Sequence, residues 1–264
     1  MVSIIESIIL GIIQGLTEWF PVSSSGHLAL YQNLFNVDVP VLFDIYLHLG
    51  TLLVLFIFFW KEISGIIKDV VGLKWKSPNM LIASYIVMGC VITGALGMLF
   101  YDFFSSGFND LRYVGFGFLF SGIILFVSGK VKKKRDHVNF GDAVTVGFFQ
   151  GLSLIPGVSR SGATIGSGML RGADRVKIAK FSFLMSIPAI FGAALIQSLG
   201  YFGGAVPFLR ENLIAVILGV FFSAFVGYLT LSGLMRIIKK GGFHHFSWYC
   251  FVIGIITLIL NFSI

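Results

Sequence analysis

The sequence predicts an all-α polytopic membrane protein, with six transmembrane helices and two re-entrant helix pairs in an inverted-topology repeat. Three observations support this: the composition, the number of long apolar stretches, and a polar motif that occurs twice. Of the 264 residues, 56% are hydrophobic and only 12% are charged, and the mean hydropathy is +0.93. A soluble domain carries about twice that share of charged residues. We therefore expect a single integral membrane domain over residues 1–264.

Six stretches are long enough to span a bilayer, which needs about 20 apolar residues in a helix. They are residues 41–60, 80–101, 112–129, 181–200, 213–235 and 246–263. Two further apolar runs, 1–20 and 140–155, each end in a proline, a segment rich in Ser and Gly, and a second short apolar piece. This pattern favours a pair of half-helices that enters and leaves on one side, with its broken backbone covered by protein or lining a cavity.

The net charge of +7 is explained by loops rather than by a nucleic-acid partner. The segments 61–79, 130–139, 171–180 and 236–245 hold 16 of the 19 Lys and Arg residues, and the positive-inside rule places all four in the cytoplasm. With six spans, residues 1–30 then enter from outside and residues 140–170 from the cytoplasm. Glu6 interrupts the first apolar run, which argues against a cleavable signal. Cys90 and Cys250 lie in apolar runs and form no disulfide or metal motif.

The polar motif occurs twice at a fixed offset of 136 residues. GIIQGLTEWFPVSSSGHL (11–28) aligns with GFFQGLSLIPGVSRSGAT (147–164), and 8 of the 18 positions are identical. The charge pattern gives the two copies opposite orientations, so the chain divides into inverted repeats at approximately 1–129 and 140–264. Repeats of this kind place a binding site near the membrane midplane, where broken helices meet. The two motifs should therefore converge on one cavity.

The second motif has the residue types that bind an oxyanion. Arginine offers a bidentate fork to phosphate, hydroxyls donate further hydrogen bonds, and glycines and a helix N-terminus favour negative charge. The alternative is a helix cap whose arginine reaches lipid headgroups, but an arginine between apolar runs is costly and usually functional. The candidate residues are Ser159, Arg160, Ser161, Gly162 and Thr164.

The first motif supplies acid, base and nucleophile candidates. Glu18 lies inside an apolar run, and His27 is a candidate nucleophile or general acid/base. Gln14 and Glu18 are four residues apart, so they share a helix face and are candidate ligands for a divalent cation. Glu18 is alternatively a partner for Arg160, and His27 a hydrogen-bonded residue at a helix start. The remaining candidates are Ser23, Ser24, Ser25 and Gly26.

Asp44 and His48 form another pair four residues apart, at the start of a predicted span. Either they hydrogen-bond the residues that contact the ligand and so orient them, or they bond only to each other.

These residues carry a resemblance. GxxQGLTEWxPVSSSGHL together with PGVSRSGATI resembles the undecaprenyl-diphosphate phosphatase family, also called bacitracin-resistance proteins. The resemblance implies an inverted repeat with re-entrant helix pairs, removal of the terminal phosphate of undecaprenyl diphosphate, and recycling of the carrier lipid for peptidoglycan synthesis. It also implies a divalent cation, magnesium or calcium, and a bacterial cytoplasmic (inner) membrane protein. Many members have Glu in place of Gln14, and a basic residue in place of Cys250.

The resulting hypothesis is metal-assisted hydrolysis of a phosphoanhydride in a polyprenyl diphosphate lipid. Arg160, the hydroxyls and backbone N–H groups hold the diphosphate, Glu18 with Gln14 positions the cation or orients His27, and the active site opens to the outer (periplasmic) side. The attacking group is left open between His27, the hydroxyls of Ser23–Ser25, and water, and the oligomeric state leaves room for a homodimer. The rival is a lipid-phosphate flippase or anion transporter, which shares the midplane site but needs no acid/base pair.

Overall fold

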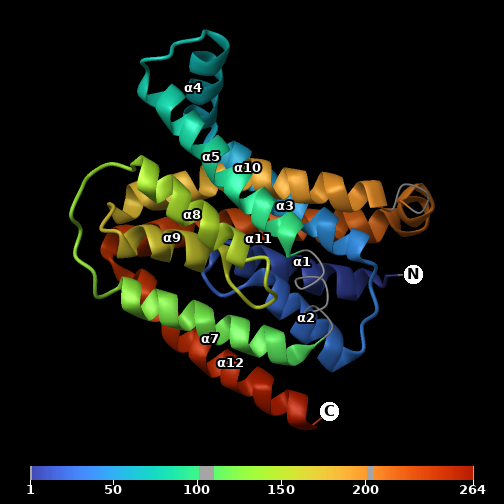
Figure 1. The fold of residues 1–264 in the computed structure, drawn as a ribbon. Helices are drawn as coiled ribbons and strands as arrows, with labels where there is room; N and C mark the ends of the chain where they lie inside the picture. Colours follow the sequence, from blue (N-terminus) through green and yellow to red (C-terminus); the bar gives the residue numbers. More distant parts are fainter. Residues whose placement is uncertain (1, 101–109, 201–204, 264) are drawn as a thin grey trace.

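The computed structural model describes residues 2–100, 110–200 and 205–263 (Figure 1). Regular structure in these residues is helical, apart from one isolated bridge between Arg135 and Ala173. The prediction of an all-α protein is confirmed. The elements are α1 (Ile4–Trp19), α2 (Ser24–Phe35), α3 (Val41–Phe58), α4 (Trp60–Val71), α5 (Pro78–Leu99), α7 (Leu111–Ser128), α8 (Phe140–Leu152), α9 (Arg160–Leu170), α10 (Arg175–Gly200), α11 (Ala205–Lys240), the short 3₁₀ helix η2 (Gly242–His245) and α12 (Phe246–Ser263).

Within these described ranges, six helices are long and apolar enough to cross a membrane: α3, α5, α7, α10, α11 and α12. They coincide with the six predicted stretches, so the chain is a multi-pass membrane protein. Two of them are longer than expected. Helix α10 already begins at Arg175, and α11 continues to Lys240 after a kink at Asn212, where φ is −122°. The predicted span 213–235 starts directly after this kink.

The pairs α1/α2 and α8/α9 are built from helices of 11 to 16 residues, which are shorter than a bilayer-spanning helix. Each pair folds back on itself. Asp142 at the start of α8 accepts a hydrogen bond of 2.9 Å from Arg171 just after α9, and Val2 and Val37, which flank α1/α2, join one apolar cluster. This geometry is compatible with the predicted re-entrant pairs, whose depth in a bilayer stays a prediction.

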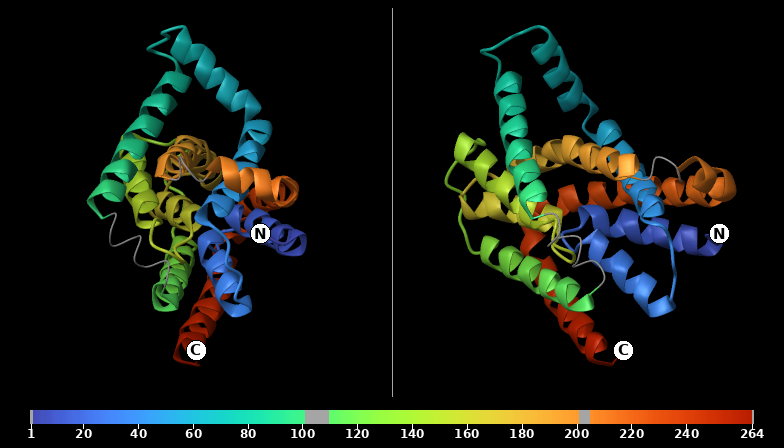
Figure 2. Two further views of the ribbon diagram at one scale, coloured as in Figure 1. Left: turned by 90° about the vertical axis from the view of Figure 1, so that its right-hand side faces the viewer. Right: turned by 45° about the vertical axis from the view of Figure 1, so that its right-hand side comes forward.

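Helix α4 lies in a segment that the sequence predicts only as a basic connection. Together with the first part of α5 it projects from the body of the molecule (Figures 1 and 2). Its helical spacing turns Ile63 into the core, while Lys61 and Lys68 stay exposed. Glu62 accepts a 2.6 Å hydrogen bond from Lys180 of α10. The basic segment therefore contains a helix with one buried face, and its lysines lie on the exposed side.

The two halves of the chain interleave. Helix α1 packs along α11, and its repeat counterpart α8 packs along α5, while α7 and α12 lie side by side (Figure 1). The α1–α11 contact and the α8–α5 contact both depend on glycine. A Cβ atom at Gly11 would lie 2.5 Å from the Gly219 carbonyl oxygen, and one at Gly147 would lie 2.7 Å from the Gly89 oxygen. Close backbone approach of this kind is typical of helix packing in membranes. It also brings the ends of α1, α2 and α9 together.

Candidate functional site

The two polar motifs form matching helix starts. Ser23 caps α2, and its hydroxyl accepts a 3.2 Å hydrogen bond from the Gly26 N–H group. Ser159 caps α9 and accepts a 3.1 Å hydrogen bond from the Gly162 N–H group. A serine cap satisfies one of the N–H groups that a helix start leaves unpaired. The cap in the sequence alternative for the second motif is present at Ser159, but Arg160 pairs with Glu18 instead of reaching lipid headgroups. The caps fix the residues that follow them.

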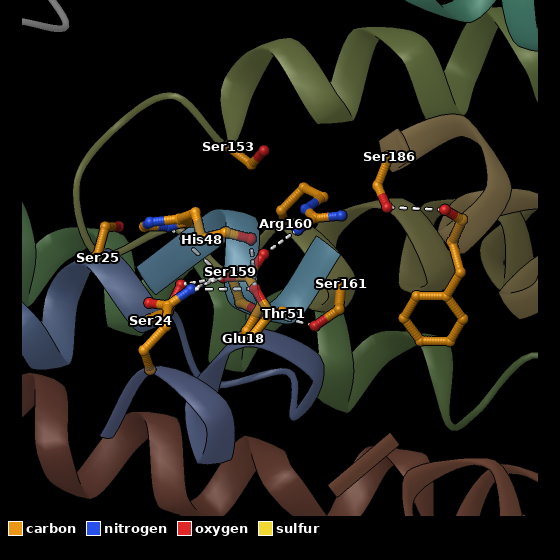
Figure 3. A network of polar contacts seen from close by, with 12 residues as sticks. Glu18, Ser24, Ser25, His48, Thr51, Ser153, Ser159, Arg160, Ser161 and Ser186 are labelled. Atoms are coloured by element: carbon orange, nitrogen blue, oxygen red, sulfur yellow. Dashed lines mark hydrogen bonds and ion pairs between the residues drawn. The ribbon is translucent and has the colours of Figure 1, made fainter. Parts of the chain in front are cut away.

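Those following residues converge on Glu18, near the end of α1 (Figure 3). The Ser24 hydroxyl donates to Glu18 Oε2 at 2.5 Å, and the Arg160 guanidinium forms an ion pair with Glu18 Oε1. Ser24 and Arg160 are the first residues of α2 and α9. Arg160 thus bonds a carboxylate 142 positions earlier in the chain, which confirms that the two motifs meet.

Glu18 is only 6% exposed, so its charge requires compensation. Besides Ser24 and Arg160, it receives a 3.1 Å hydrogen bond from Gln14 Nε2 and lies 3.7 Å from His48 Nε2. The Arg160 side chain is 17% exposed and the His48 side chain 30%. The carboxylate is therefore buried beneath two groups that remain reachable from outside the protein.

Arg160 is held on a second side by Trp19, whose ring centroid lies 5.7 Å from the guanidinium carbon. A guanidinium over an indole face is a favourable arrangement. Because arginine has five N–H donors in a planar fork, it can keep its bond to Glu18 and still offer donors to a phosphate. The predicted role of Glu18 as a partner of Arg160 is thus compatible with a role in chemistry.

The other predicted residues divide into two groups. Ser25 and Ser161 lie beside the caps, with hydroxyl distances of 3.3 Å to Ser23 and 3.2 Å to Ser159. Ser161 also donates to the Phe20 carbonyl at 3.3 Å. Thr164 is fully buried, donates to the Arg160 carbonyl at 2.7 Å and lies 2.6 Å from the Ser182 hydroxyl. The serines thus stay near the centre, whereas Thr164 connects α9 to α10.

His27 lies in the first turn of α2 but bonds away from Glu18. Its Nδ1 atom lies 2.7 Å from the Ser23 carbonyl oxygen, and its Nε2 atom lies 2.7 Å from the Tyr249 hydroxyl of α12. The imidazole beside Glu18 belongs instead to His48, whose Nδ1 bonds the Asp44 carbonyl at 2.8 Å. The Asp44 carboxylate turns to Gln32, at 3.2 and 3.3 Å. The structure thus brings His48, rather than His27, to the carboxylate.

Sequence reasoning underweighted His48 and missed Thr51 and Tyr249. Thr51 accepts a 3.5 Å hydrogen bond from Gln14 Nε2 and donates to the His48 carbonyl at 2.9 Å. The spacing of Asp44 and His48 was a usable signal for the face of α3 that meets α1. Tyr249 carried no such signal, because its partner lies 222 residues away.

The residues around Glu18 fit a divalent cation only when it is shared with a ligand. The described residues contain no group of three or more His, Cys, Asp or Glu side chains that could hold a metal. However, Gln14 Oε1 is buried and has no hydrogen-bond partner among them. An amide oxygen and a carboxylate are ligand types of Mg²⁺ and Ca²⁺, and Mg²⁺ in particular takes its remaining ligands from phosphates and water. The donor set therefore fits a cation that arrives with a phosphate substrate.

The fold and the site together define a multi-pass α-helical membrane protein whose two short helix pairs bring a carboxylate, a guanidinium and a hydroxyl into contact. Residues 7–256 match the family described as bacitracin resistance protein BacA, and the chain belongs to that family. The resemblance inferred from the two motifs is thereby confirmed.

Similar proteins cover the whole chain. The chain is 40% identical over 260 residues to the undecaprenyl-diphosphatase of Carboxydothermus hydrogenoformans, with 97% of each chain covered. It is 38% identical over 261 residues to the undecaprenyl-diphosphatase of Halothermothrix orenii, covering 97% of this chain and 98% of the relative. It is 37% identical over 280 residues to the undecaprenyl-diphosphatase of Methanosphaera stadtmanae, covering 99% of each.

Proposed function

We propose that this protein hydrolyses undecaprenyl diphosphate to undecaprenyl phosphate and inorganic phosphate, and so recycles the lipid carrier for cell-wall synthesis and confers bacitracin resistance. The observation that carries the proposal is the buried Glu18 carboxylate between the Ser24 hydroxyl and the Arg160 guanidinium. An oxyanion-binding group, a base and a hydroxyl nucleophile are thus in contact, which is the arrangement that phosphoryl transfer requires.

The diphosphate binds where the starts of α2 and α9 meet. Arg160 supplies a bidentate donor to the terminal phosphate, and the free N–H groups at the two helix starts favour negative charge. The Ser25 hydroxyl lies beside its cap and can donate a further hydrogen bond, and the Ser161 hydroxyl can do so when it turns from the Phe20 carbonyl to the phosphate. The exposed apolar surface of the spans places them in a bilayer. The prenyl chain of the substrate extends into the same bilayer.

Ser24 is the nucleophile that the geometry favours, because its hydroxyl already donates to Glu18 at 2.5 Å. The Ser24 oxygen attacks the terminal phosphorus, its proton passes to Glu18, and the bond from phosphorus to the bridging oxygen breaks. Undecaprenyl phosphate leaves and takes the proton from Glu18 on its freed oxygen, which restores the carboxylate. Water then attacks the phosphoserine, gives one proton back to the serine oxygen and releases inorganic phosphate. Arg160 stabilises the charge that builds up on the phosphate oxygens in both steps.

Gln14 and Glu18 would hold the divalent cation, magnesium or calcium, through Oε1 of the amide and a carboxylate oxygen. When bound, the cation neutralises phosphate charge and makes phosphorus easier to attack. The protein's own contribution is to keep Gln14 Oε1 free and buried while Gln14 Nε2 anchors Glu18.

The membrane assignment extends the same proposal. The chain lies in the bacterial cytoplasmic (inner) membrane, its four basic segments face the cytoplasm, and the site opens to the periplasm. The exchange of helices between the halves, α1 onto α11 and α8 onto α5, supports an inverted-topology repeat with two re-entrant pairs. A homodimer is compatible with the large exposed apolar surface of the spans.

The proposal is tested with purified protein in detergent and a C15 or C55 prenyl diphosphate. We expect phosphate release that depends on magnesium or calcium and is lost in Arg160→Ala, Glu18→Ala and Ser24→Ala. Lipid-phosphate transport in vesicles without any phosphate release would instead support the flippase or anion transporter. The 2.5 Å contact of Ser24 with Glu18 favours hydrolysis, because an anion carrier does not need an activated hydroxyl.

A further inference from the structure

The first turn of α12 contacts the Ser23 turn at two neighbouring positions. The Tyr249 hydroxyl lies 2.7 Å from His27 Nε2, and the two rings stack with centroids 5.7 Å apart and planes 12° apart. The adjacent Cys250 thiol donates to the Pro21 carbonyl at 3.3 Å. Helix α12 therefore supports the loop between α1 and α2 through side chains that lie more than 220 positions further along the chain.

The loop needs support because Ser23 has φ of +67°. A residue with a side chain rarely adopts the left-handed region, and such strain persists only where surrounding contacts hold it. Two groups of His27 bond the Ser23 carbonyl, the backbone N–H at 3.3 Å and ring Nδ1 at 2.7 Å. The imidazole thus acts as a clamp on the strained residue.

The hydrogen bonds of the imidazole fix its tautomer. A carbonyl oxygen only accepts hydrogen bonds, so Nδ1 carries the proton and donates to Ser23. In the neutral ring Nε2 is then an acceptor, and the Tyr249 hydroxyl is its donor. Without the tyrosine hydroxyl, Nε2 loses its donor, and the ring loses one of the two hydrogen bonds that fix its orientation.

The second half of the chain needs no such clamp. Ser159, the counterpart of Ser23, has φ of −73°, and the position that corresponds to His27 is Ala163. The strain and the clamp therefore occur together, on the one turn that presents Ser24 to Glu18.

We propose that Tyr249 is a positioning residue that acts through His27 to hold the strained Ser23 turn, and thereby keeps the Ser24 hydroxyl on Glu18. The inference rests on the proposed phosphatase function. It assigns His27 a structural task in the reaction, as the link between α12 and the turn, in place of direct attack on phosphorus.

The test is a double-mutant cycle on the full-length protein in detergent, with Tyr249→Phe, His27→Asn and the double variant. Tyr249→Phe removes only the hydroxyl. We expect kcat to fall about tenfold with little change in KM, because attack is misaligned while the phosphate-binding groups are intact. In the His27→Asn background the same change should have no further effect. Tyr228→Phe, on the exposed face of α11, is the matched control and should behave as wild type.

A second measurement does not depend on activity. Nitrogen NMR of histidine-labelled protein should show signals of an Nδ1-protonated ring that disappear in His27→Asn, and these signals should shift in Tyr249→Phe but not in Tyr228→Phe. Wild-type kcat in Tyr249→Phe, an equal loss in both backgrounds, or an unchanged His27 spectrum would overturn the inference. Absence of phosphate release from the wild type would instead refute the proposed function.

Discussion

The two polar turns, at Ser23–Gly26 and at Ser159–Gly162, have the same capping bonds and different chemistry. Cap distances are 3.2 and 3.1 Å, and the paired hydroxyls are 3.3 and 3.2 Å apart. The residue after the cap is Ser24 in one turn and Arg160 in the other, and the position of Glu18 is taken by Leu154 in the second half. The two turns thus share one capping geometry, and under the proposed function the nucleophile and base lie in the first motif and the oxyanion-binding group in the second.

Removing the proposed nucleophile from the first turn is expected to have the largest effect on phosphate release. Ser24→Ala should reduce phosphate release at least about a thousandfold, because Glu18 then has no hydroxyl to activate for attack on phosphorus. In the wild type, acid quenching during turnover should trap phosphate on Ser24, detectable by mass spectrometry. Ser25→Ala, in the same turn, should still form the adduct. Phosphate found on His27 would contradict the assignment.

The arginine of the second turn comes next. Arg160→Ala should lower kcat by about a hundredfold to a thousandfold, the range seen when a donor to transition-state charge is removed. Arg160→Lys keeps the charge but not the planar fork, so it should recover only part of the activity. Both variants should be assayed after their folding is verified by size-exclusion chromatography. Wild-type activity in folded Arg160→Ala would show that the second turn does not contribute to the reaction.

The pair Gln14 and Gln150 tests whether only the first half binds a cation. Gln14→Glu adds a carboxylate beside Glu18 and should lower the half-saturating concentration of Mg²⁺ several-fold. Its repeat counterpart Gln150 is also buried, with an Oε1 that has no partner among the described residues, and its Nε2 donates to Thr93 at 3.2 Å, but Leu154 stands where Glu18 would supply a carboxylate. Gln150→Glu should therefore reduce thermal stability without changing the Mg²⁺ dependence. A shift in both variants would mean that cation affinity follows net charge rather than this site.

The smallest effect is expected at Ser161. Its hydroxyl bonds the Phe20 carbonyl and the cap, and it is one of several donors near the phosphate. Ser161→Ala should raise KM a few-fold with nearly unchanged kcat, which corresponds to about 1 kcal/mol for one neutral hydrogen bond. Steady-state kinetics on the C15 substrate measures both. A loss as large as that of Arg160→Ala would place Ser161 in the reaction itself.

Much of the architecture could be predicted from the sequence because it depends on neighbours in the chain. Apolar length marks each span, and the six predicted stretches overlap helices α3, α5, α7, α10, α11 and α12. Ser23 and Ser159 cap helices because a serine with a glycine three residues later satisfies the local N–H groups. Helix α4 was not predicted because the charged residues along it interrupt its one apolar face.

The site was only partly predictable, because side-chain direction depends on packing. The repeat placed Ser24, Glu18 and Arg160 in one centre, and the structure brings them into contact. The sequence could not show that His27 faces Tyr249 while His48 faces Glu18, since each histidine lies four residues after a polar residue, Ser23 or Asp44, near a helix start.

The sequence by itself therefore determined the membrane class, the six spans and the residue types of the site. It also predicted that α1/α2 and α8/α9 are two pairs of short helices. Local hydrophobicity and capping are properties of consecutive residues, so they can be read without a fold. The tertiary structure decided which groups share the Glu18 carboxylate and which turn carries strain. The rotation and close approach of helices fix these contacts, and glycines such as Gly11 and Gly147 permit that approach only when the partner helix is in place.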